Sequence, residues 1–178
     1  MEAPIRSLDC EMIGKTGKEP SSAMTERRIL QISCVFLRAV LGITFLVAVA
    51  DRFGVFGPYG SRNVSWGDFK HFEANVAILV WFVPRALIPA IAAVETGMEA
   101  LLGLALLAGF YPRIVAWSSA ALLLVFAITM SIALGILAPL GYSVFAAAGA
   151  AMLLGAVAVP RGSRAGTEAV QVPASIHL

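Results

Sequence analysis

The sequence has little of what soluble enzymes and nucleic-acid-binding proteins need. Only 13% of its 178 residues are charged, about half the usual fraction for a soluble domain. By contrast 59% are apolar, and the mean hydropathy is +0.85. The 13 basic and 11 acidic residues leave a net charge of +2, too small to attract nucleic acid. These values exclude a soluble enzyme, a nucleic-acid-binding domain and a disordered tail protein, and they indicate a chain that faces the lipid bilayer.

Metal and thiol chemistry also lack the residues they require. Cys10 lies in a polar stretch and Cys34 in an apolar run, and no C-x-x-C pair occurs. His71 and His177 lie outside the hydrophobic runs, whereas a b-type haem takes axial histidines within the bilayer. We therefore expect no metal site, and no cofactor held covalently or by metal ligation.

The charge-free runs predict an all-α membrane protein, a bundle of four transmembrane helices. Residues 114–160 are 47 consecutive residues without a charge. One helix of that length would measure roughly 70 Å against a hydrocarbon core of roughly 30 Å, so the run must turn back once. The Gly- and Pro-containing segment 135–141 is the natural turn. The expected spans are 29–50, 86–110, 114–134 and 141–159.

The placement of lysine and arginine predicts that both termini are cytoplasmic, as in a multi-pass protein of a bacterial inner membrane. In that orientation eight basic residues lie in the inner segments and four in the outer segment 51–85. The inner eight are Arg6, Lys15, Lys18, Arg27, Arg28, Arg113, Arg161 and Arg164. Residues 1–28 are expected to form a polar tail and residues 161–178 a second, flexible one. Met24-Thr-Glu-Arg-Arg also has the form of a start site, which leaves open whether residues 1–23 belong to the native chain.

Three ionisable residues interrupt the expected spans, namely Arg38 in the first and Glu95 and Glu99 in the second. The two glutamates are four residues apart, so they share one helix face. Because the first two spans run antiparallel, counting from their ends places Arg38 and Glu99 at similar depth. A charge at the bilayer centre costs about 2.5–3.5 kcal/mol on insertion scales. We therefore expect an Arg38–Glu99 pair, with Glu95 nearby, either as a device that fixes helix register or as a proton- or ligand-binding site.

The outer segment 51–85 predicts an amphipathic helix after the first span. Ser65 is a candidate first cap, with Asp68 at the reciprocal capping position. Apolar residues then recur at helical spacing, which predicts a helix over 66–83 at the membrane interface. This segment is either a simple anchor or a lid over the polar cluster, contributing Trp66, Asp68 and His71.

Small residues mark the last two spans. Ala147, Ala151 and Gly155 form a four-residue ladder, and 118–121 reads Ser-Ser-Ala-Ala. Such faces allow close helix contact, either inside the bundle or across a homodimer.

Two stretches together resemble the DoxX family of membrane proteins. They are Arg38-Ala-Val-Leu-Gly-Ile-Thr-Phe-Leu46 and Glu99-Ala-Leu-Leu-Gly103-Leu-Ala-Leu-Leu-Ala-Gly109, the second followed by Arg113. The likeness covers about residues 29–159. The chain departs from the family's first motif at 50–53, which reads Ala-Asp-Arg-Phe, and adds a loop around 66–72.

The resemblance implies a four-helix inner-membrane protein. Some relatives are subunits of quinone-linked oxidoreductases, such as one that oxidises thiosulfate, and others scaffold redox enzymes or assist membrane-protein assembly. Arg38 and Glu99 match the family's polar core, and no catalytic residue carries over.

Three functions therefore stay open. The first is a redox-associated membrane subunit whose Arg38, Glu95 and Glu99 hold a quinone, with a partner protein supplying electrons. The second is an assembly factor or scaffold without catalysis. The third is a small proton-coupled transporter.

Overall fold

The computed structural model describes residues 20–158 of the chain, with side chains from Met24 onward. The chain divides into residues 1–35 and 36–178. In the first unit the described part is the start of helix α1 (Pro20–Arg52), and its side chains at 24–33 are exposed. Of the predicted polar tail 1–28, residues 20–28 are helical and form the start of α1. The first 19 residues of this tail, and the predicted tail 161–178, lie outside the described residues.

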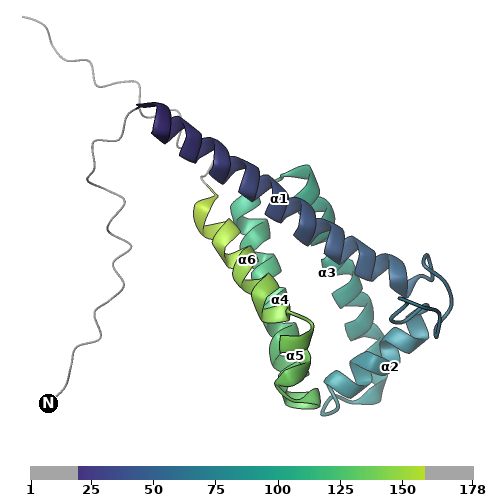
Figure 1. The fold of residues 1–178 in the computed structure, drawn as a ribbon. Coiled ribbons are helices and arrows are strands. Elements are labelled where there is room, and N and C mark those ends of the chain that lie inside the picture. Colours follow the sequence, from purple (N-terminus) through teal and green to yellow (C-terminus); the bar gives the residue numbers. More distant parts are fainter. Residues whose placement is uncertain (1–19, 159–178) are drawn as a thin grey trace, which may run out of the picture. The chain divides into compact units, whose positions relative to one another are not determined.

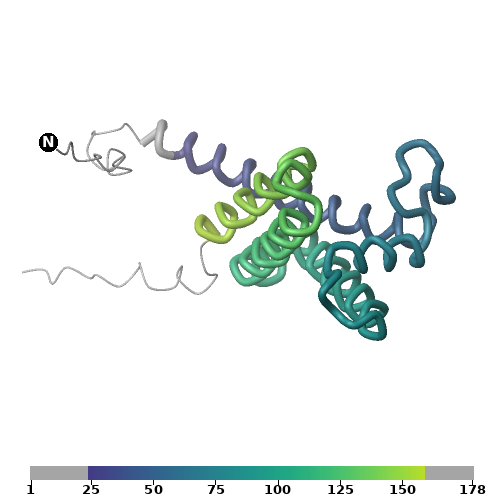
Figure 2. Tube along the Cα trace, turned by 90° about the horizontal axis from the view of Figure 1, so that it is seen from below, coloured from purple at the N-terminus to yellow at the C-terminus, as the bar shows by residue number. Residues whose placement is uncertain are grey.

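The second unit is helical throughout its described part, which contains no strand, as expected for an all-α membrane protein. After α1 come α2 (Phe69–Leu79), a 3₁₀ turn η2 (Arg85–Leu87), α3 (Ile88–Ala108), α4 (Pro112–Leu134), α5 (Leu137–Gly141) and α6 (Val144–Val157). Both views of the chain place α6 alongside α4, and α2 lies at one end of α3 and α4 (Figures 1 and 2).

Three helical stretches are long and apolar enough to cross a membrane: 24–52, 85–108 and 112–134. They correspond to the first three predicted spans, within two residues at each end except at the start of the first. The predicted fourth span, 141–159, is shorter in the structure. Within it, Gly141 ends the five-residue α5, Ser143 takes a left-handed backbone conformation with φ of 56°, and Val144–Val157 form the 14 residues of α6. A helix of that length measures roughly 21 Å, less than the hydrocarbon core.

Helices α1 and α3 approach each other closely at two glycines. A Cβ atom on Gly42 would lie 2.9 Å from the carbonyl oxygen of Gly103, and a Cβ on Gly103 would lie 3.0 Å from the carbonyl oxygen of Gly42. Only hydrogen fits between these backbones, as at other small-residue helix crossings. This contact sets which residues of α1 and α3 face each other.

The small residues of α4 and α6 pack inside the bundle. Ser119 and Ala120 of α4 and Ala151 and Gly155 of α6 are all buried. A Cβ on Gly155 would lie 2.9 Å from the Trp117 ring. Ser118 and Ala121 are exposed and Ala147 is half-buried, so contact within one chain accounts for part of the pattern, and the homodimer stays a prediction.

The helix after the first span is shorter than predicted and begins at a different cap. Asp68, not Ser65, is the N-cap of α2, and its carboxylate accepts a hydrogen bond of 2.9 Å from the backbone N–H of His71. Gly67, with φ of +68°, takes a backbone conformation outside the helix, and a Cβ there would collide with the backbone of Tyr59. The helix therefore cannot extend back to residue 66.

The apolar face of α2 is covered by protein. Phe72 and Val76 form a buried cluster with Ile88 and Ala92 of α3. The exposed aromatic residues Trp81 and Phe82 follow α2 instead of lying on it. The helix is therefore amphipathic as predicted, but its apolar side faces α3 and not an open interface.

Replacing Asp68 by alanine should increase amide hydrogen exchange in the first turn of α2 and leave α3 unchanged. The backbone N–H of His71, followed by its ring, lowers the pKa of Asp68 below the ordinary value of 3.8. Because the native pKa is lowered, the cap stabilises α2 fully above pH 3.8, and this stabilisation is lost as the pH falls through the native value. Asp68→Asn, which keeps an acceptor oxygen, is the matched control. Equal protection of His71 in the wild type and in Asp68→Ala would contradict the cap.

Candidate functional site

Arg52, the last residue of α1, lies at the centre of a buried polar cluster. Its side chain is 2% exposed, and its Nη2 atom lies 2.7 Å from Oε2 of Glu99 and 3.7 Å from Oε1 of Glu95. Its Nη1 atom donates a 2.8 Å hydrogen bond to the hydroxyl of Thr96, which in turn donates to the carbonyl of Ala92. We call Arg52, Glu95, Thr96 and Glu99 the Arg52 cluster.

Aromatic rings cover the guanidinium on its remaining side. The Cζ atom of Arg52 lies 3.6 Å from the centre of the Phe72 ring and 5.2 Å from that of Trp66. The two rings meet edge to face. A cation over an aromatic face is attracted by the ring electrons, more strongly when water is excluded. Helix α2 and its preceding loop therefore help to hold the charge of Arg52 in place.

Asp51 ties the outer loop to the end of α1. Its Oδ2 atom accepts hydrogen bonds from the backbone N–H groups of Ser65 and Trp66, at 3.0 and 2.9 Å. The side chain is buried. These two bonds bring Trp66 to the position in which its ring faces Arg52.

The cluster has more acid than base. One guanidinium faces the two carboxylates of Glu95 and Glu99, so a surplus negative charge remains when both are ionised. Oε2 of Glu99 lies in the 2.7 Å ion pair with Arg52, whereas Oε1 of Glu95 accepts no hydrogen bond within the described residues. Nε of Arg52 and Oδ1 of Asp51 are likewise buried without a hydrogen-bond partner there. Buried polar atoms with unused bonding capacity mark a site able to take up a proton, a water molecule or a ligand.

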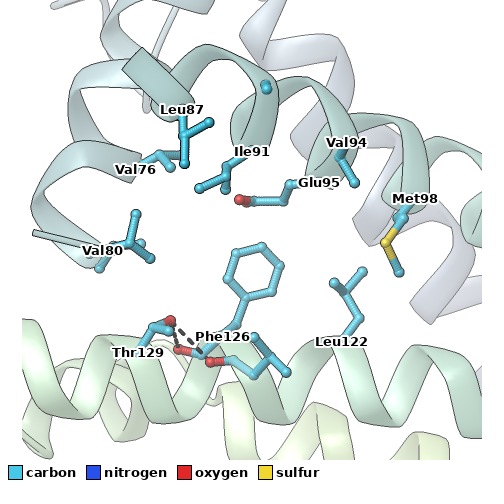
Figure 3. Close-up of a pocket in the computed structure, with 13 residues that line it drawn as sticks. Val76, Val80, Leu87, Ile91, Val94, Glu95, Met98, Leu122, Phe126 and Thr129 are labelled. Carbon is cyan, nitrogen blue, oxygen red and sulfur yellow. Dashed lines mark hydrogen bonds between the residues drawn. The ribbon is translucent and has the colours of Figure 1, made fainter. Parts of the chain in front are cut away.

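A cavity of about 400 Å³ lies beside the cluster, between α2, α3 and α4. Glu95 belongs to its wall, and Figure 3 shows this carboxylate pointing into the cavity from α3, with Phe126 and Thr129 of α4 on the opposite wall. The other lining residues are apolar: Val76, Leu79, Val80, Leu87, Ala90, Ile91, Val94, Met98, Leu122 and Val125. Cavities of this size and character hold small organic molecules oriented by a few polar groups.

The cavity is open on a side formed by apolar side chains of α3 and α4. Val94 and Met98 of α3 are 63% and 42% exposed, and Val125 of α4 is 58% exposed. Both helices are among the three long enough to cross a membrane. In a bilayer such an opening would face lipid chains.

The predicted partner of the glutamates was wrong. Arg38 does not pair with Glu99, because its Nε and Nη2 atoms donate to the backbone carbonyl of Leu106, at 3.0 and 2.9 Å. Its guanidinium also lies against Gly109, whose missing Cβ leaves the space it occupies. Arg38 thus satisfies a carbonyl in the last turn of α3, and Arg52 is the partner of Glu95 and Glu99.

Of the predicted lid residues, the structure brings one to the cluster. Trp66 lies over Arg52, whereas Asp68 and His71 bind each other, with His71 Nδ1 2.9 Å from Asp68 Oδ2. The His71 ring stacks on Tyr59 with 3.8 Å between ring centres. The side chains of His71 and Asp68 are 43% and 51% exposed. This pair belongs to the start of α2 and its surface.

Arg52, Asp51 and Thr96 were missed as site residues because the first span was predicted to end at residue 50, which assigned Arg52 to the outer loop. The glycines could have corrected this. Where Gly42 faces Gly103 in an antiparallel helix pair, Arg52 lies near the level of residue 93, within one turn of Thr96, which its long side chain reaches.

Comparisons of the chain with protein-family models, with curated proteins and with solved structures found no match. The site must therefore be interpreted from its own chemistry.

Proposed function

We propose that the chain is a DoxX-like, four-span inner-membrane protein with both termini in the cytoplasm. Three span-length helices and the apolar α6 beside α4 support the bundle. The eight inner against four outer basic residues support the orientation. The order and spacing of the Arg38 and Glu99 motifs support the family.

We further propose that this protein is a quinol-binding subunit of a membrane redox system. One observation carries the proposal: the Glu95 carboxylate lines a cavity whose other walls are apolar except for Thr129, and this cavity opens between two span-length helices. A quinol is a lipid-soluble molecule with a hydroxyl group to donate, and it would enter such a cavity from the bilayer.

Different residues of the cavity bind different parts of the quinol. The Glu95 carboxylate accepts a proton from a quinol hydroxyl. Arg52, whose Nη2 atom lies 3.7 Å from Oε1 of Glu95, stabilises the negative charge left on the quinol oxygen. The quinol ring lies against Phe126, and its isoprenoid tail leaves between Val94 and Val125. Oxidation of the quinol releases two protons and two electrons: one proton passes to Glu95 and the other to water, and both electrons pass to a partner redox protein, the reverse of the electron flow expected from the sequence.

Quinol binding to the full chain in lipid nanodiscs tests this function. We expect Glu95→Gln to weaken binding of a short-chain quinol by about 10–100-fold, the loss expected for one hydrogen bond to a charged group. Leu122→Trp, which fills the cavity, should also abolish binding. Ile128→Trp changes α4 on an exposed face outside the cavity and should bind normally. Unchanged binding by both Glu95→Gln and Leu122→Trp would refute the proposal.

A scaffold role is the second candidate, and one observation favours it. Arg52 joins α1 to α2, α3 and the outer loop through Phe72, Glu99 and Trp66, which is what a purely structural clamp would do. A scaffold predicts that a stably folded Glu95→Gln protein keeps full function in cells. The quinol function predicts that it does not.

A further inference from the structure

The three carboxylates near Arg52 are not equally engaged. Asp51 accepts two backbone hydrogen bonds, and Glu99 lies 2.7 Å from the guanidinium. Glu95 lies 3.7 Å from the same nitrogen, too far for a direct hydrogen bond, and extends into the cavity. Glu95 is therefore the carboxylate with the most remaining capacity to bind a positive charge.

The rest of the cavity places no positive charge opposite Glu95. The charged groups that face it are Arg52 from α1 and Glu99 from its own helix. From α2 and α4 come apolar side chains and the hydroxyl of Thr129, which donates to the carbonyls of Val125 and Phe126. A cation entering the cavity meets a carboxylate on one wall and the Phe126 ring on the other (Figure 3).

We infer that this cavity binds hydrophobic ammonium ions in exchange for a proton on Glu95. The exchange is balanced: the protonated Glu95 carboxyl releases one proton to water as the ammonium ion enters, and the carboxylate and ammonium then form an ion pair. The apolar walls bind the hydrocarbon part of the ligand. This activity goes beyond quinol binding and does not require any electron transfer.

Charge complementarity favours an ammonium ion over an anionic or neutral ligand. An anion would face the surplus carboxylate at short range in an environment of low dielectric constant. A neutral hydrocarbon would gain the apolar contacts alone. The carboxylate should therefore discriminate between a cation and a neutral molecule of the same shape.

The test uses benzyltrimethylammonium and its neutral isostere neopentylbenzene, with the full chain in nanodiscs. We expect saturable binding of the ammonium ion. At a pH low enough for Glu95 to be protonated before the ion binds, one proton should be released per ion bound in weak buffer, and binding should weaken about tenfold for each further unit of decreasing pH. Neopentylbenzene should bind more weakly and release no proton.

Two variants complete the test. Glu95→Gln should weaken ammonium binding by about tenfold or more and abolish proton release, while Glu73→Gln, a carboxylate on α2 outside the cavity, should leave both unchanged. Leu122→Trp, which keeps Glu95, should also prevent binding. Wild-type binding by Glu95→Gln, equal binding of the two probes, or no ammonium binding at all would overturn the inference. Quinol binding measured on the same preparation separates the two proposals, because either ligand can fail alone.

Discussion

Replacing Arg52 by methionine should lower the free energy of unfolding by about 3–5 kcal/mol, the usual loss when one partner of a buried ion pair is removed. Methionine fills much of the volume of the arginine stem, so the loss reflects charge and not an empty space. The variant leaves Glu95 and Glu99 with no cation in reach among the described residues and leaves Thr96 without its donor. The measurement is unfolding of the purified protein in detergent, by heat or by added denaturant.

Two further variants separate charge from packing. Arg62→Met changes an exposed arginine of the outer loop and should alter stability by less than about 0.5 kcal/mol. Adding Glu95→Gln and Glu99→Gln to Arg52→Met removes the unpaired acids and should recover most of the lost stability. If the triple variant is no more stable than Arg52→Met alone, the charges are not what makes Arg52 important.

Substituting alanine for Gly42 should destabilise the protein by about 1–3 kcal/mol, the range for overpacking a tight contact. The added Cβ would lie 2.9 Å from the backbone oxygen of Gly103 and from the Leu107 side chain. A backbone oxygen cannot move aside as a side chain end can, so α1 and α3 must separate. Because Arg52 lies on α1 and Glu99 on α3, ammonium binding should weaken as well.

Gly97 is the matched control for Gly42. It lies within α3, and a Cβ there would meet nothing within 4 Å outside its own helix. Gly97→Ala should therefore be neutral or stabilise α3 by up to about 1 kcal/mol, because alanine favours helix more than glycine does. Equal thermal stability of Gly42→Ala and Gly97→Ala would show that the two helices do not touch at Gly42.

The positions of the long helices followed from the sequence because lipid-facing helices need long charge-free runs. Residues 114–134 contain no charged side chain, and residues 86–108 contain only two, both acidic. The end of α1 was harder to predict. The polar pair Asp51-Arg52 resembles the start of a loop, yet both side chains are buried because α2 and residues 53–68 cover them.

The pairing of charges could not be predicted by counting from the span ends. That count assumes that neighbouring helices end at the same level. Here Gly42 faces Gly103, and Arg52 at the end of α1 bonds to Thr96, about two turns into α3. The register shift brings Arg52 to Glu99 and leaves Arg38 with the carbonyl of Leu106. Glu99 is buried and Glu95 is partly buried beside it, and the arginine that faces them is Arg52 instead of the predicted Arg38.

The loop contacts around Trp66 also could not be predicted from the sequence pattern. A capping box at Ser65 and Asp68 matches the residue types, but the backbone N–H of Ser65 is bound by Asp51, fourteen residues earlier. Contacts between residues so far apart leave no periodic signal in one sequence. The apolar spacing at Phe72 and Val76 did predict the buried face of α2.

A double-mutant cycle between Arg52 and Glu99 tests the central claim most directly. Unfolding free energies are measured for the wild type, Arg52→Met, Glu99→Gln and the double variant, and the same cycle is made with Arg38→Met in place of Arg52→Met. We predict a coupling energy of about 0.5–3 kcal/mol for Arg52 with Glu99, the range for residues in contact, and near zero for Arg38 with Glu99. Additive effects in the Arg52 cycle, or coupling confined to the Arg38 cycle, would contradict the account.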